Sequence, residues 1–82
     1  MSSQKLSNIS LSKLRKFLKA CGLNEITINK GRGGHEKWSK LGMDRPIMFQ
    51  SHIDPVPEFI IQQILRHLNL SRDEFFKIFN DL

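Results

Sequence analysis

The spacing of apolar residues changes twice along this chain, and the order of these changes restricts the folds that it can adopt. Apolar residues recur every three or four positions from Leu11 to Cys21, as they do on a helix. Between Ile26 and Ser51, short segments alternate apolar and polar residues as half-buried strands do, and the helical spacing returns after Pro57. A chain of 82 residues has room for one domain. The sequence therefore predicts a single α+β domain.

Signals for the ends of helices refine this order. Ser10 or Ser12 can cap the first helix, and Gly22 can end it in a left-handed conformation. The long second helix is expected to begin near Pro57, because proline suits a first helical turn. Ser71 and Glu74 have the spacing of a capping box, which predicts a short extra helix at the C-terminal end.

The strands are expected to form an antiparallel meander, because the segments between them are short. Their predicted ranges are 26–29, 35–40 and 46–51. The helices of so small a domain can cover only one face of a three-stranded sheet, which leaves the other face open. This α-β-β-β-α layout resembles that of double-stranded-RNA-binding domains. We assign it to residues 10–82 and expect residues 1–9, which show no apolar period, to be flexible or loosely docked.

Positive charge is concentrated in the first half of the chain. The net charge is +5, yet residues 13–45 contain nine basic and three acidic residues, and residues 46–82 carry a net charge of −2. Such a distribution attracts nucleic acids through counterion release, although surface lysines also serve solubility alone. The single cysteine excludes an internal disulfide framework, and no apolar run reaches the ~20 residues of a membrane span. We expect a cytoplasmic protein that binds RNA and has no membrane contact.

The most unusual segment is the glycine-rich stretch 30–38, KGRGGHEKW. Glycines let a backbone approach a phosphate closely, and Lys30 and Arg32 add positive charge at the same place. His35 follows directly, and its imidazole can exchange a proton with a ribose 2′-hydroxyl or a leaving oxygen. The plain alternative is a glycine turn followed by an ordinary surface histidine, and residue types alone favour that alternative.

Other side chains are weaker candidates for chemistry. His52 ends the third predicted strand, where it can supply a second acid or base or simply cap a turn. Trp38 can stack on an unpaired base, although a lone tryptophan in a small domain more often packs in the core. Glu36 should point to the opposite face of the strand from His35. No spacing of cysteine and histidine supports a metal site, and we expect no cofactor.

The order of elements, the Gly-Gly-His sequence at the beginning of the second strand and the tail ILRHLNLSRDEF over residues 64–75 together resemble the HicA toxin family. The resemblance spans residues 10–79. It implies a fold like that of double-stranded-RNA-binding domains, cleavage of mRNA, and inhibition by a HicB-type antitoxin protein that masks the active site.

Carried over residue by residue, the family's catalytic histidine falls on His35 and the glycine of its motif on Gly33. Gly34 stands where the common Gly-Ser-His motif has serine, and Glu36 stands where many members have a second histidine. Residues 55–57 (Pro-Val-Pro) replace a Lys-Gly pair that often precedes the long helix.

The leading hypothesis is therefore a toxin of a type II toxin–antitoxin pair that cleaves mRNA with a single catalytic histidine, His35, and without a metal. RNA would lie across the first helix and the glycine-rich turn. A non-catalytic RNA-binding module, or a toxin that has lost activity, explains the charge and the fold equally well. A third reading is a protein-interaction domain whose basic face docks an acidic partner. The residues expected to contact RNA are Lys16, Lys19, Lys30, Arg32, Gly33, Gly34 and Lys37.

Overall fold

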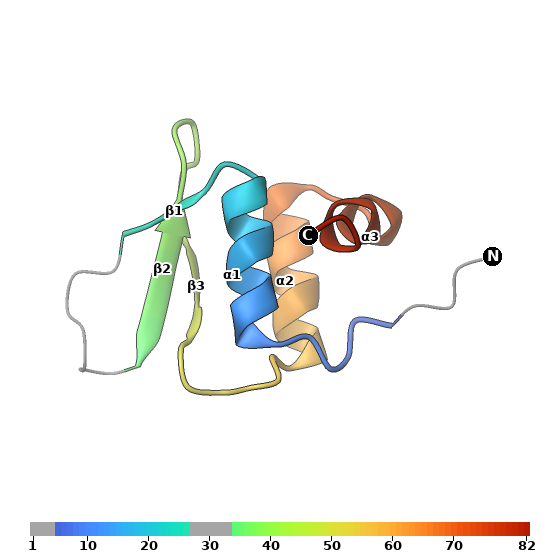
Figure 1. Cartoon of the computed structure of the whole chain (residues 1–82). Helices are drawn as coiled ribbons and strands as arrows, with labels where there is room; N and C mark the ends of the chain where they lie inside the picture. Colours follow the sequence, from blue (N-terminus) through green and yellow to red (C-terminus); the bar gives the residue numbers. More distant parts are fainter. Residues whose placement is uncertain (1–4, 27–33) are drawn as a thin grey trace.

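The computed structural model describes residues 5–26 and 34–82. Six elements follow one another: α1 (Leu11–Ala20), β1 (Asn24–Glu25), β2 (His35–Ser39), β3 (Ile47–Gln50), α2 (Glu58–Leu68) and α3 (Arg72–Phe79). The strands form one antiparallel sheet in the order β1-β2-β3. The sheet makes up one side of the molecule and the helices the other (Figure 1). The predicted α+β class and the antiparallel meander are confirmed.

Helix α1 begins and ends where the sequence signals place it. The Ser10 hydroxyl accepts a hydrogen bond from the backbone N–H of Lys13 at 3.1 Å, which caps the first turn. Gly22 has φ +89°, a left-handed conformation that glycine adopts without strain. The N–H of Leu23 then donates to the carbonyl of Leu18 at 3.0 Å, so the chain folds back against the end of the helix.

The later helices also follow their local signals. Pro57 is the N-cap of α2, one position before the first helical residue. Asn69 ends α2 with φ +58°, which asparagine tolerates better than most residues. Ser71 and Glu74 form both bonds of the capping box, at 3.1 and 2.8 Å, so the predicted start of α3 is confirmed.

Strand β1 differs from its prediction. It begins at Asn24 and ends at Glu25, whereas we expected residues 26–29. Ile26 donates its N–H to the carbonyl of Lys37 at 2.8 Å, so the register places both side chains on the same face. Ile26 is 45% exposed and does not enter the core. The chain reaches the sheet early because Leu23 is already anchored at the end of α1, and residues 27–29 lie outside the described residues.

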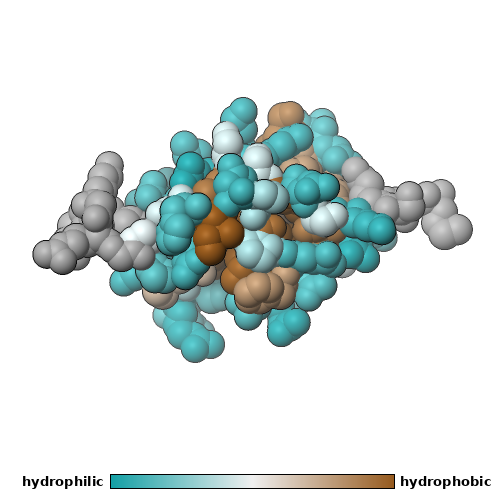
Figure 2. All heavy atoms as spheres, turned by 90° about the horizontal axis from the view of Figure 1, so that it is seen from below, coloured by the Kyte–Doolittle hydropathy of each residue, from teal (hydrophilic) through white to brown (hydrophobic). Residues whose placement is uncertain are grey.

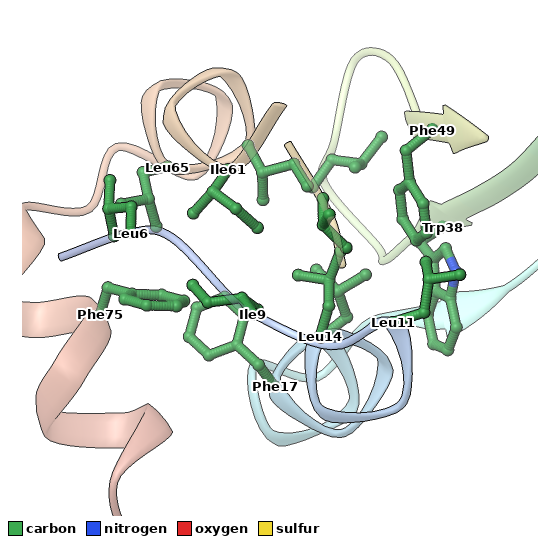
Figure 3. Close-up of a cluster of buried hydrophobic side chains, with 14 of the residues drawn as sticks. Leu6, Ile9, Leu11, Leu14, Phe17, Trp38, Phe49, Ile61, Leu65 and Phe75 are labelled. Carbon is green, nitrogen blue, oxygen red and sulfur yellow. The ribbon is translucent and has the colours of Figure 1, made fainter. Parts of the chain in front are cut away.

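The described part of the N-terminal segment, residues 5–9, is packed on the domain. Leu6 and Ile9 are each 3% exposed, and Figure 3 shows both within the cluster of core side chains. The carbonyl of Ile9 accepts from the N–H of Val56 at 2.8 Å. These two apolar residues cover core surface that the helices leave open, and their polar neighbours conceal this in the sequence.

Aromatic rings join the helices in the same core. Phe17 of α1 and Phe75 of α3 meet edge to face, with ring centroids 4.7 Å apart, and both side chains are fully buried. Figure 3 shows these rings close to the side chains of α2. Within the described ranges, no helix is long and apolar enough to cross a membrane.

Candidate functional site

The open face of the sheet carries the main functional candidate. His35 and Lys37 of β2 are exposed on this face, and they lie opposite Gln50 and Met48 of β3 respectively, which are also exposed. The intervening residues are buried on the face that the helices cover. The prediction that one face stays open is confirmed, and it places His35 where a large substrate can reach it.

His52 lies beside the residue that precedes His35. The carbonyl of Gly34 accepts a hydrogen bond from the N–H of Ser51, which brings the end of β3 against the start of β2. A methyl group added at Gly34 would lie 2.8 Å from His52 Nδ1, and Gly34 has φ +60°. A serine side chain at this position would therefore be strained and would crowd the imidazole. Glycine at position 34 allows both histidines to occupy the same end of the sheet.

A groove runs from His35 toward the start of α2. Its volume is about 280 Å³, and its walls include Met48, Ile53 and Phe59, which are 52%, 37% and 61% exposed. In Figure 1, the connection from β3 to α2 runs along the lower side of the molecule. Figure 2 shows the molecule from that side, with hydrophobic atoms exposed among hydrophilic ones. This groove was not predicted from the sequence. One signal was present, because Met48 is an apolar residue at the outward position of an alternating strand.

Beneath His35, a buried carboxylate links the sheet to the first helix. Glu36 is 4% exposed and accepts hydrogen bonds from Arg15 Nε at 3.0 Å, from Arg15 Nη2, and from Trp38 Nε1 at 3.0 Å. Burial raises the pKa of Glu36, but the bonds from Arg15 and Trp38 outweigh burial, so the net pKa is lowered. Glu36 does point away from His35, as predicted. It fixes β2 against α1 and thereby fixes the backbone from which His35 projects.

Trp38 packs in the core, which was the favoured interpretation of the sequence, and its ring is not exposed for stacking on a base. Its side chain is 1% exposed, and Figure 3 shows it in the core cluster near Phe49. The alternation of β2 directs Trp38 to the same face as Glu36, and the indole N–H is used by that carboxylate. Trp38 therefore serves the packing of the sheet against α1.

The predicted RNA-contacting residues fall into separate groups. Lys37 shares the open face with His35, whereas Lys16 and Lys19 are exposed on α1, in the layer that covers the opposite face of the sheet. The structure does not bring these two groups onto one surface. Gly34 directly precedes β2, and the other predicted contacts, Lys30, Arg32 and Gly33, lie outside the described residues.

The third histidine lies on another element. His67, near the end of α2, has its Nε2 3.0 Å from the backbone carbonyl oxygen of Arg45. This contact joins α2 to the turn between β2 and β3, which is a structural role. Over residues 5–26 and 34–82, no three histidine, cysteine, aspartate or glutamate side chains come close enough to hold a metal ion.

Comparisons of the chain with protein-family models, with curated proteins and with solved structures gave no match. Its function has to be argued from its own residues.

Proposed function

We propose that this chain is an endoribonuclease toxin of the HicA type, with a fold like that of double-stranded-RNA-binding domains, and that it cleaves mRNA without a metal ion. The observation that carries this proposal is the position of His35, exposed on the open face of the sheet with His52 next to Gly34. Two imidazoles at one end of an accessible surface are suited to moving protons on a large substrate.

The proposed reaction is an internal transesterification of RNA. One histidine accepts the proton of a ribose 2′-hydroxyl while its oxygen forms a bond to the adjacent phosphorus. The bond from phosphorus to the 5′-oxygen breaks, and the other histidine gives that oxygen a proton, leaving a 2′,3′-cyclic phosphate and a 5′-hydroxyl. Lys37, on the same face, supports the charge on the phosphate.

Inhibition would come from a HicB-type antitoxin that covers the open face and removes His35 from the substrate. This part of the proposal rests on the resemblance of residues 10–79 to the toxin family. It fits a site that lies on an exposed face of the sheet, where a protein partner can reach and cover it.

The test is inducible expression of the wild type, His35→Ala and His67→Ala in bacteria, with growth and mRNA integrity followed together. We expect growth arrest and mRNA decay for the wild type and for His67→Ala, which removes a histidine of another element. We expect about 10²–10⁴-fold slower cleavage by purified His35→Ala, the usual loss for a proton-transfer group. Full toxicity of His35→Ala would overturn the assignment of His35.

A non-catalytic RNA-binding module is the second candidate, and one observation favours it. The lysines at positions 16, 19 and 37 are exposed on two surfaces, which suits contact with phosphates over a wide area more than a single cleavage point. This candidate predicts RNA binding that weakens steeply with salt, together with intact RNA at every protein concentration.

A further inference from the structure

The groove beside His35 concentrates the exposed apolar surface of the domain. Over residues 5–26 and 34–82, six large hydrophobic side chains are exposed, and Met48, Ile53 and Phe59 among them line this one groove. These three come from β3, from the connection after it and from α2, so they meet only in the folded chain. Clustered apolar surface of this kind marks a binding site more often than scattered apolar residues do.

Size and lining limit what the groove can hold. Its volume of about 280 Å³ is below the range of about 300–1,000 Å³ for drug-sized ligands, so it suits one planar ring and not a helix. Asp, Glu, Lys and Arg are missing from its described lining, and its hydrogen-bonding side chains are His35 and Gln50. These two lie opposite each other on adjacent strands. The amide of Gln50 offers both a donor and an acceptor.

We propose that this groove binds one unpaired nucleobase of the RNA, next to the phosphate on which His35 acts. The proposal rests on the proposed function, because it takes RNA as the ligand. Met48, Ile53 and Phe59 cover the faces of the base, and Gln50 meets its hydrogen-bonding edge. Lys37 lies opposite Met48 on the same face, where its positive charge complements the flanking phosphate. The groove is thus a subsite for single-stranded RNA, because a paired base has no free edge or face to offer.

The test uses short single-stranded RNA oligonucleotides in which every ribose carries a 2′-O-methyl group, so that cleavage cannot occur. Affinity is measured by fluorescence anisotropy for the wild type and for Phe59→Ala, with Leu41→Ala as the matched control. Leu41 is 102% exposed and lies outside the groove, and neither substitution removes a core side chain. A second oligonucleotide series lacks the base at one position at a time.

We expect Phe59→Ala to weaken binding by about 5- to 150-fold, the usual range for losing one base-stacking contact, and Leu41→Ala to bind as the wild type does. Removing the base at one position should weaken wild-type binding by a similar factor. The same removal should have little effect in Phe59→Ala, because the contact is already lost. Gln50→Ala should change the preference among the four bases more than it changes mean affinity.

The proposal is overturned if Phe59→Ala binds as tightly as the wild type, or if base removal costs both proteins equally. It is also overturned if the groove proves to be a contact between two copies of the chain. In that case the wild type would be a dimer, and Phe59→Ala would be a monomer with unchanged affinity for RNA. Cleavage assays test the proposed endoribonuclease separately from the proposed subsite. If cleavage needs His35 but not Phe59, the chain is an endoribonuclease without this subsite. If RNA binding needs Phe59 but no RNA is cleaved, the subsite is present and the chain is not an endoribonuclease.

Discussion

Truncating Arg15 to alanine tests how strongly the buried carboxylate of Glu36 holds β2 against α1. In the wild type, Glu36 receives hydrogen bonds from Arg15 Nε and Nη2 and from Trp38 Nε1. In Arg15→Ala the carboxylate keeps only the indole bond and loses its counterion, although it is 4% exposed. An unpaired charge in such a place is costly, because few water molecules can reach it.

The size of the effect follows from the exposure of the two partners. Removing one partner of a fully buried ion pair costs about 3–5 kcal/mol. The Arg15 side chain is 39% exposed, so solvent screening reduces the value of the pair, and we expect a loss of about 2–3 kcal/mol at pH 7. Domains of this length unfold with about 4–12 kcal/mol, so the variant should stay folded. Glu36→Gln keeps an acceptor for Trp38 and leaves Arg15 in contact with water, so it should cost only about 1 kcal/mol.

The dependence on pH supplies a second check with a definite sign. Burial raises the pKa of Glu36, and the bonds from Arg15 and Trp38 lower it further than burial raises it, so the folded value lies below the unfolded one. The stabilisation is therefore present above the unfolded pKa of about 4.3 and is lost as the pH falls through the folded value. In Arg15→Ala burial acts without the cation, so the pKa of Glu36 should rise. The difference between wild type and variant should shrink from pH 7 to pH 3.

The assay is urea unfolding followed by the fluorescence of Trp38 at several pH values. Arg72→Ala is the control, because Arg72 and Glu58 form an exposed ion pair at 4.0 Å that should contribute less than about 1 kcal/mol. A loss below 1 kcal/mol for Arg15→Ala, or a loss that stays constant from pH 7 to pH 3, would refute the reasoning.

Two further predictions concern α3 and the end of α1. Ser71→Ala should lower the free energy of unfolding, measured by thermal unfolding, by about 1 kcal/mol. Ser71→Asp should lower it much less, because aspartate can also accept the hydrogen bond from the N–H of Glu74. Equal losses for the two variants would contradict the capping role. Burial raises the pKa of the Cys21 thiol, and the nearby positive charge of Lys40 opposes this increase only in part. Cys21 should therefore react with iodoacetamide at pH 8 more slowly than a cysteine in an unfolded peptide does. Equal rates in buffer and in urea would show that the thiol is not protected.

Features decided by near neighbours in the chain were predictable. The caps of α1 and α3 depend on residues three positions apart, and the left-handed Gly22 depends on its missing side chain. The exposure of His35 followed from the alternation of β2, once one face of the sheet was expected to stay open. These predictions needed no knowledge of which elements pack together.

Features that join distant segments were not predictable from the pattern. Arg15 and Glu36 are 21 residues apart, and a charged residue at an inward strand position gives no sign of its partner. The groove beside His35 depends on the path of the connection from β3 to α2, which brings Ile53 and Phe59 toward the edge of the sheet. Leu6 was hidden in the same way, since two apolar residues among polar neighbours show no period.

The contact between the N-terminal segment and the connection before α2 has a consequence for how the protein is made. The N–H of Leu11 donates to Asp54 Oδ1 at 3.1 Å across 43 residues of chain, and Ile9 pairs with Val56 next to it. A ribosome adding about 5–20 residues per second needs about 2–9 s to make that stretch, during which Ile9 lacks the bond that Val56 later supplies. Val56 also lines the groove beside His35, so one wall of the groove is held in place by a segment that is synthesised well before it.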